Sequence, residues 1–269
     1  MPASSLRAST LAALFVVAAS FGPVRAQAQN GYSEARNASV DASNALSARI
    51  EADAGSLQVE GVPGISQVRV RGVARSSQRG RLAGIKLIAE RRGTEIFIKS
   101  EIPQDRGWQM LRGNFFMALD LVIEVPITLA LDVVDGSGEA VFLGTGPLTL
   151  NDGSGSIEVR GIRGDVRITD GSGEIVIDGV EGSVWLNDGS GEIRVSNVTG
   201  DVIVDDDGSG DIRIAGVGGT VRIDDDGSGA IAVSRVAGDF IVRSAGSGGI
   251  THNTVKGTVS IPERKRRGT

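Results

Sequence analysis

The sequence contains no cysteine and only one histidine, His252. Without cysteine the chain can form no disulfide and has no cysteine for an N-terminal lipid anchor, so packing alone must stabilise the fold. A single histidine leaves almost no material for a transition-metal site or for nucleophilic catalysis assisted by histidine. We therefore expect a non-enzymatic protein with no catalytic residues, no cofactor and no metal site.

Aromatic residues are also scarce, at 4% of the chain. Trp185 lies between Val184 and Leu186, whose side chains we expect to point inward, so its ring should point outward. There it is either a contact point or a cover for a neighbouring strand. Trp108 falls in an irregular insertion, the kind of segment in which binding residues tend to gather.

Long apolar runs are missing as well. The apolar stretch from Leu11 to Phe21 is about half as long as a membrane-spanning helix of roughly 20 residues. It follows Arg7 and precedes small residues between Val24 and Ala28, which is the pattern of a secretory signal with its cleavage site. Residues 1–28 are therefore predicted to be a signal peptide that exports the protein to the periplasm or the cell surface, with no membrane span after cleavage. The net charge of −5 gives no indication of a nucleic-acid partner.

What the sequence does contain is an internal repeat. The motif Asp-Gly-Ser-Gly recurs at intervals of roughly 17–19 residues, with the shorter intervals first. It begins at Asp135, Asp152, Asp170, Asp188, Asp207 and Asp226, with an altered seventh copy at Ala245-Gly246-Ser247-Gly248. Such regularity is typical of a stacked array in which each repeat buries its apolar side against its neighbours.

Within each repeat, β-branched residues alternate with polar ones, which indicates two short strands with glycine-rich corners. About five aliphatic side chains per coil are expected to point inward. In four successive coils these are Ile157, Val159, Ile162, Val166 and Ile168; Ile175, Ile177, Val180, Val184 and Leu186; Ile193, Val195, Val198, Val202 and Val204; and Ile212, Ile214, Val217, Val221 and Ile223. The pattern predicts an all-β, single-domain β-solenoid of stacked coils, each of about 18–19 residues.

The N-terminal half of the solenoid is predicted to be less regular. An early coil appears at Ala54 to Val62, followed by Val68 to Val70, so the solenoid is assigned to residues 48–261 after a lead segment at 29–47. Residues 71–116 interrupt it with a hairpin between Ile85 and Ile98 and a loop at 103–114. Residues 262–269 form a basic tail, in which Pro262 and the charges after it would block pairing at the end of the array.

The repeated aspartates form the most conspicuous polar feature. Those of adjacent coils would lie about 5 Å apart, with a mutual repulsion near 1 kcal/mol in water. We expect them to lie in solvent, to accept hydrogen bonds from the following Gly and Ser amides, and to lie near a column of arginines. These arginines are Arg160, Arg167, Arg194, Arg213, Arg222, Arg235 and Arg243.

An alternative interpretation is a calcium-binding solenoid, in which the aspartates of adjacent coils share ions. Ca²⁺ prefers six to eight oxygen ligands, whereas most coils offer one or two carboxylates at this corner. The triplets Asp205-Asp206-Asp207 and Asp224-Asp225-Asp226 are the best candidates. His252 falls at an inward position of the last coil, where it is expected to act as a polar cap.

Three features together resemble a known family of bacterial exported proteins, the putative-adhesin family of β-solenoid domains of unknown function. They are the signal peptide together with the early turn from Gly55 to Val62, the segment Val122 to Val133, and the Gly-Ser-Gly repeats that follow it. The resemblance covers about residues 48–261 and implies a β-solenoid, with no binding site that can be carried onto named positions.

The function predicted from the sequence is that of a non-enzymatic envelope or cell-surface protein, adhesin-like or a scaffold. It would present its repetitive surface to a glycan or to an envelope protein. The calcium-binding solenoid is the alternative. A polysaccharide-degrading β-helix enzyme is the least favoured, because no carboxylate stands out from the repeat as a catalytic group would.

Overall fold

The computed structural model describes residues 31–103 and 115–262. The predicted signal peptide, Trp108 and the charged part of the basic tail lie outside the described residues. No helix in the described part of the chain is long and apolar enough to cross a membrane.

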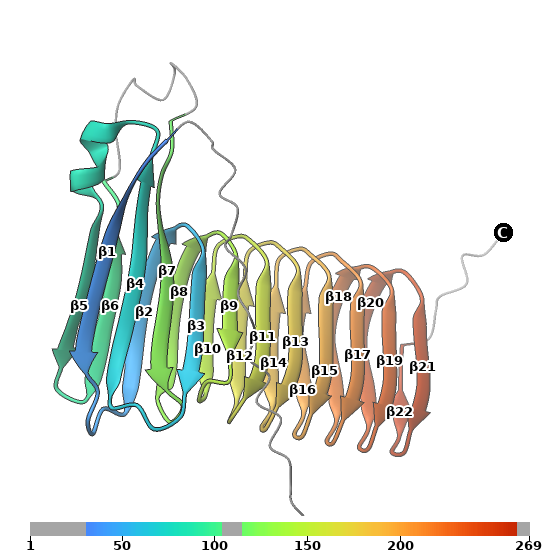
Figure 1. Cartoon of the computed structure of the whole chain (residues 1–269). Coiled ribbons are helices and arrows are strands. Elements are labelled where there is room, and N and C mark those ends of the chain that lie inside the picture. Colours follow the sequence, from blue (N-terminus) through green and yellow to red (C-terminus); the bar gives the residue numbers. More distant parts are fainter. Residues whose placement is uncertain (1–30, 104–114, 263–269) are drawn as a thin grey trace, which may run out of the picture. The chain divides into compact units, whose positions relative to one another are not determined.

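The described chain is a β-solenoid with two parallel faces, each an 11-stranded sheet (Figure 1). We name them sheet A and sheet B. Sheet A contains, in spatial order, β1 (Tyr32–Asp41), β4 (Gln67–Ser76), β7 (Met117–Pro126), β3 (Leu57–Val62), β9 (Ala140–Leu143), β11 (Ile157–Ile162), β13 (Ile175–Val180), β15 (Ile193–Val198), β17 (Ile212–Val217), β19 (Ile231–Val236) and β21 (Ile250–Val255). Sheet B contains β22 (Val259–Ser260), β20 (Phe240–Ser247), β18 (Val221–Ser228), β16 (Val202–Asp207), β14 (Val184–Asp188), β12 (Val166–Asp170), β10 (Leu148–Asp152), β8 (Ala130–Ser137), β2 (Ser47–Ala54), β6 (Glu95–Glu101) and β5 (Lys86–Arg92).

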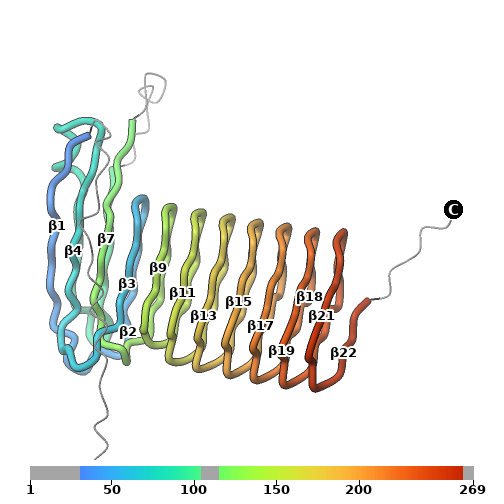
Figure 2. The backbone as a smooth tube through the Cα atoms, turned by 45° about the vertical axis from the view of Figure 1, so that its right-hand side comes forward, coloured from blue at the N-terminus to red at the C-terminus, as the bar shows by residue number. Residues whose placement is uncertain are grey.

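The regular part of the solenoid consists of seven coils, from β8–β9 to β20–β21, and each coil gives one strand to each sheet (Figure 2). Successive strands pair in parallel and in register, for example Ile157 with Ile175 and Ile175 with Ile193. The predicted inward residues are buried, and all of those named above are at most 2% exposed. The prediction of an all-β solenoid is therefore confirmed.

The coils become one residue longer between Asp188 and Asp207, and this change has a local cause. The pairing of β14 with β16 shifts after Leu186, so that Asn187 lies opposite Asp206 rather than Asp205. Asp205 is the extra residue, and it forms a β-bulge that leaves the core register on both sides intact.

The N-terminal end of the stack is closed by strands of mixed direction. β2 and β3 form the early coil, which pairs in parallel with β8 and β9. Val68 to Val70, expected to continue that coil, instead belong to β4, which runs antiparallel to β7 and β1. β5 and β6 form an antiparallel hairpin, and the 3-10 helix η1 (Arg79–Gly84) precedes it. Part of the lead segment, β1, is the outermost strand of sheet A.

The other end of the stack has no such cover within the described residues. β21 and β22 are the last strands of their sheets, and Ile261 is 41% exposed. His252 pairs with Val233, which places it in an inward column as expected, and its ring lies 6.1 Å from that of Phe240. It is nevertheless exposed, because no described coil packs over it.

The corners of the coils require glycine at one position. The second glycine of the repeat motif, such as Gly173, has a φ of +146°, and a Cβ atom there would lie 1.6 Å from the carbonyl oxygen of Gly155 in the preceding coil. Both the backbone conformation and the close approach therefore exclude a side chain.

We expect Gly173→Ala to destabilise the protein by roughly 3 kcal/mol, which lowers the melting temperature by about 6–12 °C. Gly249→Ala is the matched control, because no atom lies within 4 Å of the Cβ that it would add. Thermal unfolding followed by circular dichroism measures both. Equal midpoints for the two variants would contradict the close corner packing.

Candidate functional site

The six repeat aspartates form a buried column at the corner where sheet B leads into sheet A. Their exposed fractions are only 0–3%. They are Asp135, Asp152, Asp170, Asp188, Asp207 and Asp226, and each pairs in register with the next. The expectation that these side chains lie in solvent is wrong.

The alternation of the strand explains the burial. In β12, Val166 and Ile168 point inward and Thr169 points outward, so the next residue, Asp170, points inward again. The same order of buried and exposed residues recurs in β10 and β14. The signal was present in the sequence, but the charge of aspartate argued against an inward position.

Few hydrogen bonds satisfy these carboxylates. The amides of Ser172 and Ser190 donate to Asp170 Oδ1 and Asp188 Oδ1, both at 3.2 Å, so the predicted turn hydrogen bonds are present in these two coils. Both carboxylate oxygens of Asp135, Asp152 and Asp207 are buried without a hydrogen-bond partner. A buried acceptor without a partner costs about 1–3 kcal/mol, and a charged one costs more.

The arginines do not compensate the column. They lie on the outer faces and pair with other carboxylates: Arg160 with Glu158, Arg194 with Glu174 and Glu192, Arg213 with Glu192 and Asp211, and Arg222 and Arg243 with Asp224. The expectation that the arginine column balances the aspartates is therefore also wrong. The two columns point to opposite sides of the sheets.

Burial without a cation raises the pKa of the aspartates. Desolvation is the main cause of the raised pKa at all six positions, and at every position except Asp170 the charge of another aspartate adds to it. The pKa rises to about 7 for Asp135 and Asp207 and to about 6 for Asp152 and Asp188, and it is also raised for Asp170 and Asp226. Two charges about 5 Å apart repel by about 3 kcal/mol at an effective dielectric constant near 20, so full ionisation of the column is costly.

The carboxylates do not gather into a calcium site. In the triplet of β16, Asp207 is buried while Asp205 and Asp206 are exposed, and Asp205 lies 3.7 Å from Arg222. In β18, Asp224 accepts ion pairs from Arg222 and Arg243 on the outer face. No group of three acidic or histidine side chains in the described ranges is arranged to hold a metal ion, whereas Ca²⁺ requires six to eight oxygens.

The outer face of sheet A carries a shallow channel of about 560 Å³ across β13, β15, β17, β19 and β21. It lies where outward side chains become short. The column that holds Arg194 and Arg213 continues as Ala232, and the adjacent column holds Ser196, Ala215 and Ser234. The channel follows the direction of stacking and therefore crosses several coils.

The outer face of sheet B has a smaller hollow of about 290 Å³ beside Trp185. The Trp185 ring points outward, as predicted, and the guanidinium of Arg167 lies 4.0 Å from its centroid. Thr149, Thr169 and Asn187 line the same hollow. The arginine covers one face of the ring, so this tryptophan packs against its own neighbouring strand.

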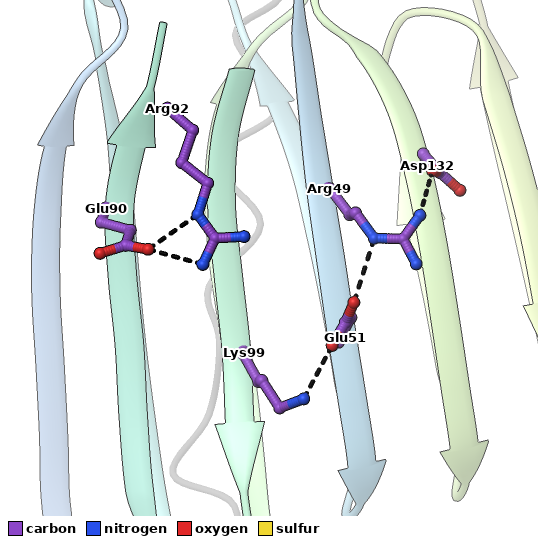
Figure 3. Close-up of polar contacts among 6 residues, drawn as sticks. All are labelled: Arg49, Glu51, Glu90, Arg92, Lys99 and Asp132. Carbon is purple, nitrogen blue, oxygen red and sulfur yellow. Dashed lines mark hydrogen bonds and ion pairs between the residues drawn. The ribbon is translucent and has the colours of Figure 1, made fainter.

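Toward the N-terminal end, ion pairs cover the outer face of sheet B (Figure 3). Arg49 pairs with Asp132 at 2.6 Å and with Glu51 at 3.1 Å, and Lys99 pairs with Glu51 at 2.9 Å. The hydrogen bond from Lys99 is the main cause that lowers the pKa of Glu51. Basic and acidic side chains alternate here, so this face has no strong local charge.

We expect calcium to leave the melting temperature unchanged, because the carboxylates do not converge on a common point. Thermal melts in calcium and in chelator should give the same midpoint for the purified protein. A midpoint that rises in calcium and falls in chelator would restore the calcium solenoid, and Asp207→Asn would then abolish the difference.

Comparison with known proteins gives structural similarity only. No protein-family model and no curated protein sequence matches the chain. A putative lipid binding protein from Parabacteroides distasonis is 14% identical, with 86% of this chain and 98% of that chain covered and a TM-score of 0.47. A putative adhesin from Bacteroides fragilis is 13% identical, with 85% and 96% covered and a TM-score of 0.42. A putative cell adhesion protein from Clostridium sporogenes is 12% identical, with 86% and 99% covered and a TM-score of 0.32. Bacterial adhesin-like proteins are thus among the solved structures to which this chain is similar.

Proposed function

We propose that this protein is an exported, non-enzymatic, adhesin-like scaffold that binds a glycan chain along the channel on the outer face of sheet A. The export step rests on the signal-peptide pattern of residues 1–28. The proposal of glycan binding rests on one observation, the channel that crosses five neighbouring strands of sheet A.

The shape of the channel supports an extended partner. Five strands span four inter-strand steps of about 4.8 Å, which gives a length of about 19 Å. The channel is shallow, and one of its outward columns keeps short side chains from coil to coil, at Ser196, Ala215, Ser234 and Asn253. A polymer with a regular repeat can make similar contacts at each step, whereas a compact small molecule needs a deep and enclosed pocket.

The chemistry of the lining supports a neutral, hydroxyl-rich partner. Ser196, Ser234 and Asn253 supply hydroxyl and amide groups, and alanines between them supply an apolar floor. The two arginines of the channel, Arg194 and Arg213, are already paired with Glu174, Glu192 and Asp211. Their charge is therefore largely compensated, so a neutral glycan is favoured over a strongly anionic one.

The lining also supports binding rather than cleavage. Glycoside hydrolysis normally uses two carboxylic acids that flank the scissile bond. Aspartate and glutamate are absent from the described residues that line the channel, and His252 is its one titratable group apart from the paired arginines. Among the serines of the lining, Ser196 donates hydrogen bonds to Asp178 Oδ1 and to the carbonyl oxygen of Ile177. Within the described residues, no serine of the lining donates a hydrogen bond to a histidine.

We expect Ala232→Trp to lower glycan affinity at least about tenfold, because the new side chain would block the channel at β19. The matched control is Val141→Trp, which lies in the same outward column but on β9, beyond the channel. Binding of the purified protein to an array of envelope polysaccharides, followed by titration calorimetry, measures the effect.

A protein that binds no glycan, or that binds equally well with Ala232→Trp, would overturn this assignment. If a pull-down from envelope extract recovers a protein and Ala232→Trp abolishes the recovery, the channel is the binding surface but the partner is a protein rather than a glycan.

A further inference from the structure

The aspartate column is continuous and has defined ends. Ala52 pairs with Asp135 at one end, and Asp226 pairs with Ala245 at the other. Between them, aspartate follows aspartate in six successive coils. The four inner members therefore have a buried carboxyl group on both sides, and the two outer members have one.

The charged groups that face the column are themselves carboxylates. Asp53 acts on Asp135, Asp206 acts on Asp207, and both Asp225 and Asp211 act on Asp226. The remaining influences come from the column itself and, at Asp170 and Asp188, from the backbone amides that follow these residues. The ion pairs formed by the described residues include none of the six aspartates. No basic side chain of the described residues thus offsets the charge.

Protonation can supply hydrogen-bond partners to the unpaired carboxylate oxygens of the column. An ionised carboxylate only accepts hydrogen bonds, whereas a protonated carboxyl group also donates one. A proton on one aspartate lets its O–H donate to a carboxylate oxygen of the next coil, and a hydrogen bond of this kind is short and strong. One shared proton thus removes a charge, supplies a missing donor and links two coils.

We propose that the aspartate column is a proton-binding site, in which carboxyl groups of adjacent coils share protons and thereby lock the stacking of the solenoid. At lower pH, the O–H of one carboxyl group donates to the carboxylate of its neighbour. As the pH rises these protons pass to water, the carboxylates become charged, and adjacent coils repel each other.

The sign of the effect follows from the pKa values. In the unfolded chain an aspartate has a pKa near 3.9, whereas in the fold burial raises the pKa to about 6 for Asp152 and Asp188 and about 7 for Asp135 and Asp207. The folded state therefore binds more protons between about pH 4 and 7, and its stability falls as the pH rises through this window. Surface carboxylates with lowered pKa, such as Glu51 and Asp178, weaken the fold only below about pH 4.

The test is the melting temperature at pH 5 and pH 8 for the purified protein and for Asp207→Asn. Asparagine has the same shape but no charge. We expect the midpoint of the wild-type protein to fall by at least about 5 °C from pH 5 to pH 8. Asp207→Asn should raise the midpoint at pH 8 by about 3–6 °C and change it less at pH 5. Asp206→Asn removes the same charge from the neighbouring, exposed position, where solvent screens its effect on Asp207, and should change the midpoint much less than Asp207→Asn at pH 8.

A second measurement does not depend on a variant. The carboxyl carbon resonances of the aspartates, followed by NMR during a pH titration of the intact protein, should include a group with midpoints near 6–7. Titration of all aspartates at or below about pH 4 would overturn the proposal. So would a wild-type midpoint that is equal or higher at pH 8, or an Asp207→Asn variant that is less stable at both pH values. Restoration of the pH 8 midpoint by calcium would show a cation site instead of a proton site.

Discussion

The in-register parallel stacking of identical positions is the constraint on which the rest of this structure depends. Neighbouring strands lie about 4.8 Å apart, so each side chain contacts the side chains at the equivalent position of the coils above and below. Aliphatic residues gain from this arrangement, because columns such as Ile157, Ile175 and Ile193 form a continuous dry core. The backbones of adjacent coils also approach closely at the corner, so one position of that corner admits only glycine. The inward residues of a single coil are too few to offset the conformational entropy that the coil loses on folding. Only the stacked array of coils is therefore stable.

The same register is unfavourable for charge. On the outer faces, acidic and basic residues are placed within reach of each other across coils, as Arg194 is with Glu174 and Arg213 is with Glu192. At the inner corner, by contrast, six successive coils each contribute an acid and none of them contributes a base. The repeat that makes the core uniform also makes this imbalance uniform, and the pKa of each aspartate rises as a result.

The sequence allowed the regular coils to be predicted almost residue by residue, because alternation with a period of two fixes which side chains point inward. The burial of Asp170 follows the same alternation, but an isolated carboxylate is so costly to bury that solvent exposure appeared the better interpretation. The strand pairing of the N-terminal half could not be predicted from this alternation. The antiparallel pairing of Val70 with Ile123 joins segments far apart in the chain, and no local pattern specifies such a partner. The channel was missed as well, because it depends on how Arg213 and Ala232, which belong to successive coils, align in space.

The channel and the aspartate column occupy the same coils. β13 to β19 carry the channel on the outer face of sheet A, and Asp170, Asp188, Asp207 and Asp226 stand at the corners that lead into these strands. The spacing of Ser196, Ala215 and Ser234 along the channel is set by the distance between coils, and the aspartates act on that same distance. The proposed proton sharing would therefore act on the geometry of the outer face through the stacking alone, because no aspartate of the column lines the channel.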